Sequence, residues 1–286
     1  MQGEEFIMKT YIAKEWQETL RFQGLSSFED LWECEKNKNF ETHWVEEPNQ
    51  RRGGWSGVVR IVLHDAAGKE RVVFLKRQSK HKYYSIGSPF KNRPTFEREF
   101  RNIIRFNRHQ IPTVTPIYYG QRGDDAILMT EELTGYRPLK SWFEQWEETA
   151  FPDRALRNRI INELARVVGK IHENHYKHCC LVFKHVFLNL DNDEVKISII
   201  DLEKLRYWFS KQYCEITDLD SLFRTRVNKI KATDKWRFIK AYLGAGASKK
   251  DIKALWQRMS LRLSKPRQSR TIRNLWKNFS GKLSKA

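Results

Sequence analysis

Arg71-Val-Val-Phe-Leu-Lys76 is a short run of β-branched and apolar residues that ends in a lysine. A similar run, Val58-Val-Arg-Ile-Val-Leu63, precedes it, and His64-Asp-Ala-Ala-Gly68 between the two is typical of a turn. Together they predict an antiparallel hairpin with Lys76 at the end of its second strand. The polar residues 48–57 predict a glycine-rich loop on the approach to this hairpin. Its glycines are Gly53, Gly54 and Gly57.

The residues after the hairpin predict a helix and a second pair of strands. In residues 95–106, four apolar side chains share one helical face, and a proline stands just before the segment. Residues 113–119 and 126–131 predict the two strands.

The N-terminal end and the second half of the chain are predicted to be mainly helical. Residues 6–35 are an expected helix, with Ser26 and Glu29 as a capping box. Residues 181–200 predict a hairpin that turns at 191–193. Further helices are expected at residues 141–146, 154–175, 218–228 and 235–243. A β-rich first half and a helical second half predict two unlike lobes.

Composition excludes several classes of protein. The 286 residues are 40% hydrophobic and 13% aromatic, which is too apolar for global disorder. No apolar run approaches the roughly 20 residues that a membrane span requires, and the N-terminus lacks the apolar core of a secretory signal. Four cysteines, two of them adjacent, form no disulfide framework, so a reducing compartment is indicated. A soluble cytoplasmic protein is expected.

The chain is strongly basic, and its charge is concentrated at the C-terminal end. Lys and Arg number 53 against 35 Asp and Glu, which gives a net charge of +18. Residues 248–286 hold 12 Lys and Arg and one acid, Asp251, and so contribute +11 of this charge. Such a surplus favours anionic partners such as nucleic acid, lipid head groups, phosphorylated glycolipids or nucleotides.

The end of this basic tail is amphipathic. Ile272, Leu275, Trp276 and Phe279 follow the i, i+3, i+4, i+7 spacing, Leu283 extends the stripe, and cations occupy the other face. The pattern predicts a helix on an anionic membrane surface. A helix whose apolar face packs on the helical lobe is an equal alternative. Nucleic acid is disfavoured as a partner because no helix-turn-helix, zinc-finger or RNP motif accompanies the charge.

A two-lobed protein that handles phosphate needs parts that this sequence supplies in order. Glycines let backbone N–H groups approach phosphates, a strand lysine held by a helix glutamate contacts them, a loop supplies a base, and an aspartate binds Mg²⁺. The candidates after the glycines are Lys76, Glu99, residues 178–185 and Asp201. Each also has a structural interpretation, as a turn, a solvated strand end, a helix-surface acid or a strand cap. Their shared order supports the functional interpretation.

Longer motifs around these residues resemble one known family. The motifs are Phe74-Leu-Lys-Arg-Gln78, Pro94-Thr-Phe-Glu-Arg-Glu-Phe100, Leu128-Met-Thr-Glu-Glu-Leu133 and Ile200-Asp-Leu-Glu-Lys204. They are similar to the bacterial lipopolysaccharide kinase family (Kdo/WaaP type), and most of all to its InaA-like branch. The resemblance covers about residues 45–244. It implies an α+β, two-lobed protein-kinase-like fold with a β-rich N-lobe, a mainly helical C-lobe and a basic C-terminal helical tail.

The resemblance also implies ATP and Mg²⁺ as cofactors. Lys76 would contact the α- and β-phosphates, and Glu99 would pair with Lys76. Residues 129–133, which include Glu131 and Leu133, would form the hinge beside the adenine. The three glycines before the hairpin would cover the phosphates.

On the side of the helical lobe, the resemblance implies that Asp201 holds Mg²⁺, that His185 is a second metal or phosphate contact, and that Asp218 braces the catalytic loop. That loop, His178-Cys-Cys-Leu-Val-Phe-Lys-His185, departs from the family, whose sugar kinases read His-Arg-Asp. Cys180 stands at the base position. A thiol with a pKa of about 8.5 is a poor substitute for a carboxylate, and loss of a general base costs roughly 10²–10⁴-fold in rate. An active kinase and a pseudokinase therefore both stay open.

The thiols and imidazoles of this loop also allow a zinc site. His178, Cys179, Cys180 and His185 are suitable Zn²⁺ ligands, but adjacent cysteines point in different directions and the C-x₂-C spacing is absent. Zinc and a vicinal disulfide are therefore disfavoured, and Cys179 is expected to be a small core residue. His172, near the end of an apolar helix, is expected to be a satisfied structural histidine.

The leading hypothesis is an ATP- and Mg²⁺-dependent, kinase-like protein that phosphorylates a core sugar of lipopolysaccharide. It would be peripheral at the cytoplasmic face of the inner membrane, with the basic tail on anionic lipid. A pseudokinase, or a basic membrane-surface or nucleic-acid-binding module, are the alternatives. The expected divisions are residues 1–44 as an N-terminal helical extension, 45–133 as N-lobe and hinge, 134–247 as C-lobe, and 248–286 as the basic tail.

Overall fold

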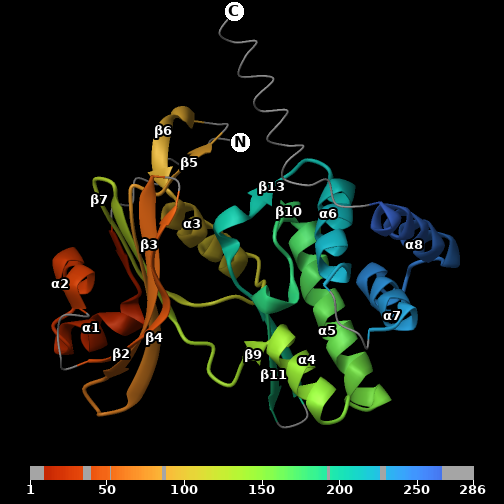
Figure 1. Ribbon diagram of the computed structural model, residues 1–286, viewed down its shortest axis with the longest axis horizontal. Coiled ribbons are helices and arrows are strands. Elements are labelled where there is room, and N and C mark those ends of the chain that lie inside the picture. The colour runs from red at the N-terminus through yellow and green to blue at the C-terminus, as the bar shows by residue number, and fades with distance from the viewer. Residues whose placement is uncertain are drawn as a thin grey trace, which may run out of the picture.

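One antiparallel sheet forms the N-lobe (Figure 1). The structure is a computed structural model that describes residues 10–34, 40–51, 53–85, 88–191, 194–225 and 230–265. The six strands run in the order β1-β7-β8-β4-β3-β2. They are β1 (Thr10–Ile12), β2 (Glu41–Arg51), β3 (Gly54–His64), β4 (Glu70–Ser79), β7 (Pro116–Arg122) and β8 (Asp125–Glu131). The predicted hairpin is confirmed as β3–β4, where Val58 stands opposite Lys76, and the predicted strand pair as β7–β8.

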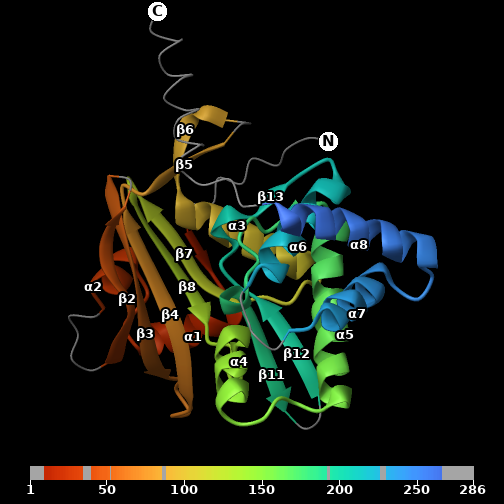
Figure 2. The ribbon, with the colours of Figure 1, turned by 45° about the vertical axis from the view of Figure 1, so that its right-hand side comes forward.

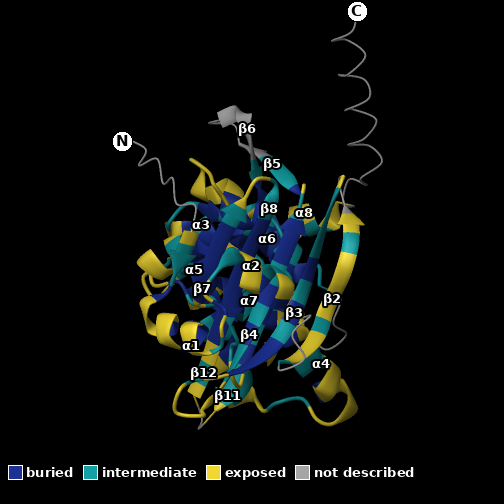
Figure 3. Cartoon of the chain, turned by 90° about the vertical axis from the view of Figure 1, so that its left-hand side faces the viewer, coloured by how far each residue is buried: buried dark blue, intermediate teal, exposed yellow. Residues whose placement is uncertain are grey.

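Side-chain alternation gives this sheet two packed faces. On one face, Leu75 contacts a cluster that includes Trp16 from the N-terminal segment. On the other face, the helix α3 (Thr95–Arg108) packs Phe100 in the same cluster as Leu128 of β8. Figure 3 shows the middle of the sheet as largely buried. Because neighbouring strand residues point to opposite faces, the side chain of Lys76 turns toward α3.

The N-terminal segment differs from the single helix predicted for residues 6–35. Residues 10–12 form β1, which pairs with β7. The following elements are η1 (Lys14–Trp16), α1 (Gln17–Phe22) and α2 (Phe28–Glu33). Gly24 has a φ of +67°, a conformation that ends a helix, and the capping box forms between Ser27 and Asp30. The segment thus completes the N-lobe sheet, and β2 runs across the expected boundary between residues 44 and 45.

Helices form most of the C-lobe (Figure 2). They are α4 (Leu139–Glu148), α5 (Arg154–Glu173), α6 (Lys211–Phe223), α7 (Ala232–Leu243) and α8 (Lys249–Ser264). Their short neighbours are β9 (Arg137–Pro138), β10 (Tyr176–Lys177), η3 (Phe183–His185), β11 (Val186–Asp191), β12 (Glu194–Ile199), η4 (Leu202–Lys204) and β13 (Arg206–Tyr207), while β5 (Lys82–Ser85) and β6 (Ser88–Pro94) form a ribbon on the N-lobe.

The predicted C-lobe elements are present with shifted ends. β11 and β12 confirm the hairpin over residues 181–200, although most of its turn lies outside the described residues. α6 begins at Lys211, seven residues before the predicted start, because the side chain of Ser210 caps it. The helix ends at Phe223, with Arg224 as its C-cap, so the predicted end at residue 228 is five residues too late.

The first part of the basic tail is a packed helix. α8 buries Leu255 completely against the C-lobe. Arg224, at the end of α6, donates hydrogen bonds to the carbonyl oxygens of Arg262 (2.7 Å) and Lys265 (2.8 Å). The predicted amphipathic stripe over residues 272–283 lies outside the described residues. Of the helices that are described, none has the length and apolar character needed to cross a bilayer.

A buried asparagine joins α3 to the C-lobe. Asn102 donates hydrogen bonds from Nδ2 to the carbonyl oxygens of Leu202 (2.8 Å) and Leu205 (3.3 Å). Leu202 directly follows Asp201, and Leu205 lies four residues after it. The contact therefore fixes the helix that carries Glu99 relative to the segment that carries Asp201.

Leu255→Ala is expected to lower the free energy of unfolding by about 2–5 kcal/mol, because it leaves a cavity between α8 and the rest of the C-lobe. Urea unfolding measures this loss. The matched control is Leu261→Ala on the same helix, where the side chain is exposed and the expected change is within about 0.5 kcal/mol. Equally small changes in both variants would show that α8 is not packed on the lobe.

Candidate functional site

Lys76 and Glu99 form a short ion pair between β4 and α3. Nζ of Lys76 lies 2.5 Å from Oε1 of Glu99, and the carboxylate is almost fully buried. Burial by itself lowers the pKa of Lys76, but Glu99, followed by Asp201 and Glu203, raises it above the usual value. Lys76 is therefore a cation at neutral pH, and Asp201 of the C-lobe lies close enough to contribute to its charge state.

The three predicted phosphate-loop glycines differ in their backbone conformation and in the space around them. Gly53 has a φ of +80° and forms the turn between β2 and β3. A Cβ at Gly54 would overlap the carbonyl oxygen of Ser79, and one at Gly57 would lie 2.9 Å from the ring of Trp44. Packing within the sheet thus accounts for Gly54 and Gly57. Gly53 alone of the three has open space around it, as a phosphate-covering turn requires.

The two residues predicted to lie at the hinge, Glu131 and Leu133, already have partners within the protein. The carboxylate of Glu131 is 2.8 Å from Nη2 of Arg71 in an ion pair. The carbonyl oxygen of Leu133 accepts a hydrogen bond from the N–H of Tyr136 at 3.0 Å. The N–H of Glu131 also donates to the carbonyl oxygen of Thr115 at 2.9 Å. An adenine contact through any of these three groups would therefore have to replace a hydrogen bond within the protein.

The side chains of His185 and Asp201 face each other across a short polar contact. Nδ1 of His185 is 2.9 Å from the carbonyl oxygen of Cys180, and because a carbonyl only accepts, this nitrogen carries the proton. Nε2 then presents its lone pair at 3.2 Å from Oδ2 of Asp201. Burial lowers the pKa of His185, against the opposing effect of Asp201. A proton on Nε2 or a metal cation can bridge the imidazole and the carboxylate at this distance.

The backbone conformation of Asp201 directs its side chain toward His185. Asp201 follows β12 and Ile200 and adopts φ 61° and ψ 58°, the left-handed region that few residues other than glycine occupy. The N–H of Ile200 donates to the carbonyl oxygen of His185 at 3.0 Å. His185 and Asp201 are thus held together by the main chain as well as by their side chains.

Cys180 completes a group of three ligands. The ligand atoms of Cys180, His185 and Asp201 all lie within 4.8 Å of one another. The four-residue zinc set considered from the sequence does not assemble, because Sγ of Cys179 turns to the carbonyl oxygen of Lys177 at 3.6 Å. Asp201 takes the third place instead. A carboxylate suits Mg²⁺, whereas thiolate and imidazole favour softer ions such as Zn²⁺.

Asp218 holds the catalytic loop through two main-chain contacts. Its Oδ2 accepts a hydrogen bond from the N–H of His178 at 2.6 Å, and its Oδ1 accepts one from the N–H of Cys179 at 3.0 Å. Cys179 has a φ of 66°, so the turn that these contacts hold is conformationally costly. Nε2 of His178 donates to the carbonyl oxygen of Ile200 at 3.0 Å, which gives this histidine a structural contact to the Asp201 segment.

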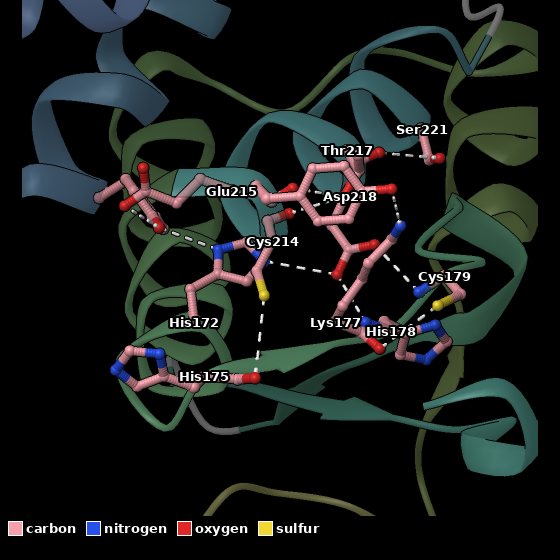
Figure 4. Close-up of polar contacts among 12 residues, drawn as sticks. His172, His175, Lys177, His178, Cys179, Cys214, Glu215, Thr217, Asp218 and Ser221 are labelled. Carbon is pink, nitrogen blue, oxygen red and sulfur yellow. Dashed lines mark hydrogen bonds and ion pairs between the residues drawn. The ribbon is translucent and has the colours of Figure 1, made fainter. Parts of the chain in front are cut away.

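A buried network stands behind Asp218 (Figure 4). Nε2 of His172 is 3.4 Å from Oδ2 of Asp218, and Nδ1 is 2.9 Å from the hydroxyl of Tyr242. That hydroxyl donates to Oε1 of Glu215 at 3.0 Å. His172 is completely buried, which confirms the prediction of a satisfied structural histidine. No sequence motif marked Tyr242 or Glu215. Their part in the network that supports the loop is seen only in the tertiary structure.

Cobalt(II) is expected to bind this protein with a thiolate-to-metal charge-transfer band, and Cys180→Ser is expected to remove the band and weaken binding by more than about tenfold. Metal binding needs a neutral imidazole, and the lowered pKa of His185 keeps that form available in weakly acidic solution. Absorption titration measures both effects.

The adjacent thiol supplies the matched control for this titration. Cys179→Ser is expected to leave the band in place because Sγ of Cys179 points to Lys177. If both variants keep the band, or both lose it, the three-residue ligand set is wrong.

Comparisons with known proteins agree with this geometry. The sequence profile of the lipopolysaccharide kinase (Kdo/WaaP) family matches residues 35–242. Protein InaA of Escherichia coli strain K12 is 30% identical over 171 residues, which cover 58% of this chain and 75% of InaA. The heptose(I) kinases WaaP of Pseudomonas aeruginosa and E. coli are 27% and 28% identical over 162 and 165 residues, about half of this chain and 58% and 60% of those enzymes.

A solved structure gives the same result for the fold. WaaP in complex with acyl carrier protein aligns with a TM-score of 0.59 at 19% identity, over 90% of this chain and all of that one. The expected two-lobed, kinase-like fold is confirmed. With a family profile that spans both lobes, the chain belongs to the lipopolysaccharide kinase (Kdo/WaaP) family.

Proposed function

We propose that this protein binds ATP with Mg²⁺ between its lobes and transfers the γ-phosphoryl group to a core sugar of lipopolysaccharide at the cytoplasmic face of the inner membrane. The observation that carries the proposal is the buried Lys76–Glu99 ion pair with Asp201 of the other lobe beside it. The two related heptose kinases support the acceptor class.

Each polar side chain at this place has a distinct part in the proposal. Lys76, fixed by Glu99, would hold phosphate oxygens as a permanent cation. Asp201 would supply the oxygen ligand for Mg²⁺, with His185 as the second contact. Bound Mg²⁺ supplies neutralisation of charge on the phosphates, and phosphoryl transfer depends mainly on such neutralisation and on positioning. The carboxylate of Asp201 is the part of this donor set that suits Mg²⁺, and Nε2 of His185 lies 3.2 Å from it.

Transfer forms a P–O bond to the sugar hydroxyl and breaks the bond between the γ-phosphorus and the bridging oxygen. The hydroxyl proton must leave, and Cys180 stands at the place of the base that would take it. Because a thiol is a weak base at neutral pH, transfer should be slower than in a sugar kinase with Asp there. Cys180 therefore also favours a second candidate function, a pseudokinase that binds nucleotide without turnover.

ATP with Mg²⁺ is expected to raise the melting temperature by a few degrees at a hundredfold excess over Kd, a stabilisation of about 2.7 kcal/mol. Lys76→Ala should abolish the shift because it removes the cation that holds the phosphates. Lys69→Ala, at an exposed lysine in the turn before β4, should leave it unchanged. A shift that survives Lys76→Ala would place the nucleotide elsewhere.

Cys180→Asp is expected to raise transfer of labelled γ-phosphate to dephosphorylated core lipopolysaccharide by roughly 10²–10⁴-fold, because it restores a carboxylate base. Asp201→Asn in the same background should remove the label from the glycolipid. If nucleotide binding is intact and neither the natural chain nor Cys180→Asp transfers phosphate, the protein is a pseudokinase.

A further inference from the structure

Exposed aromatic side chains gather on one short segment of the C-lobe. Among the described residues, seven large hydrophobic side chains are strongly exposed, and four of them lie within residues 207–213. Their exposed fractions are 56% for Tyr207, 38% for Trp208, 88% for Phe209 and 44% for Tyr213. The other three lie singly on α1, β2 and α8, as is normal for a protein surface. We call residues 206–213 the aromatic segment.

Hydrogen bonds to His175 and pairing with β10 hold the main chain of the aromatic segment in place. The N–H of Trp208 donates to the carbonyl oxygen of His175 at 2.9 Å. Nδ1 of His175 donates back to the carbonyl oxygens of Trp208 (3.2 Å) and Phe209 (3.1 Å). Tyr207 is paired with Tyr176 in the two-stranded sheet β10–β13. The exposure of the rings is therefore fixed by the fold.

Cations surround the aromatic rings. Nζ of Lys177 lies 4.3 Å from the ring centroid of Tyr213 and donates to its hydroxyl at 3.2 Å. Arg206 and Lys211 flank the three consecutive aromatic residues, and both are exposed. No acidic residue occurs between Glu203 and Glu215. The segment thus combines an apolar tip with a positively charged border.

The aromatic segment is continuous with the catalytic loop. Lys177 directly precedes His178, and it stands opposite Arg206 in the β10–β13 pair. Figure 1 shows β13 and β10 side by side at one end of the C-lobe, close to α6. The aromatic segment is thus tied through β10 to the loop that carries Cys180.

We propose that the aromatic segment inserts into the interfacial layer of a membrane that carries anionic lipid. Trp and Tyr favour this layer because their rings are apolar at one end and polar at the other. The most exposed ring is Phe209, which has no polar group and so gains most from contact with acyl chains. The lysine and arginine border is complementary to anionic head groups. This inference depends on the proposed function in one respect, the expectation that the sugar acceptor is at that membrane.

The test uses the full chain and sedimentation with vesicles of phosphatidylethanolamine and phosphatidylglycerol, without nucleotide. The double variant Trp208→Ala/Phe209→Ala is expected to bind at least about tenfold more weakly. Lys211→Gln should weaken binding about fivefold. Phe22→Ala and Lys69→Ala, at exposed positions of the N-lobe, are the matched controls and should bind as the natural chain does. Melting temperatures should be the same in all five proteins.

Unchanged vesicle binding by the double variant would overturn the proposal. The proposal would also be overturned if the double variant bound vesicles normally but no longer transferred phosphate to lipid-free core oligosaccharide. The aromatic rings would then contact the sugar acceptor. A protein that docks through the aromatic segment but transfers no phosphate in the presence of ATP and Mg²⁺ would support this inference and remove the kinase proposal. The two proposals can therefore fail separately.

Discussion

The carboxylate of Asp218 is the contact on which the C-lobe part of the site depends. It is completely buried, and burial of a charge is costly unless hydrogen bonds compensate for the lost water. Two main-chain N–H groups of the catalytic loop provide that compensation, at His178 and Cys179. The same contacts keep Cys179 in a left-handed conformation. His172 and Tyr242 then connect this carboxylate to α5 and α7, so the loop is fixed by three helices.

This arrangement explains how the loop can keep its shape while its chemistry changes. The groups that hold the loop act on its main chain, including the carbonyl oxygen of Cys180, and the side chain of Cys180 takes no part in these contacts. Cys180 can therefore replace a carboxylate without loss of the fold. Its thiol still lies beside His185 and Asp201. Under the proposed function, a thiol in place of a carboxylate would change the ligand atoms offered to a cation and the basicity on the acceptor side.

The sequence by itself predicted the parts of the site that local pattern specifies. Two β-branched runs around a turn gave the β3–β4 hairpin with Lys76 near its end. The apolar face of residues 95–106 gave α3, and with it the position of Glu99 on the neighbouring helix. The apolar run before Asp201 gave β12. In each case a residue's place follows from the periodicity of about ten neighbours, and the order of these parts along the chain indicated the fold.

Only the tertiary structure decided which distant groups meet. Residues 10–12 became a strand because β7, more than one hundred residues away, offered its edge. Asp201, rather than Cys179, joined Cys180 and His185, because a backbone turn aims the neighbouring thiols in different directions. α8 became part of the C-lobe core, and the aromatic segment stayed exposed. Burial and long-range pairing depend on what the rest of the chain brings into contact, and no local spacing of residues contains that information.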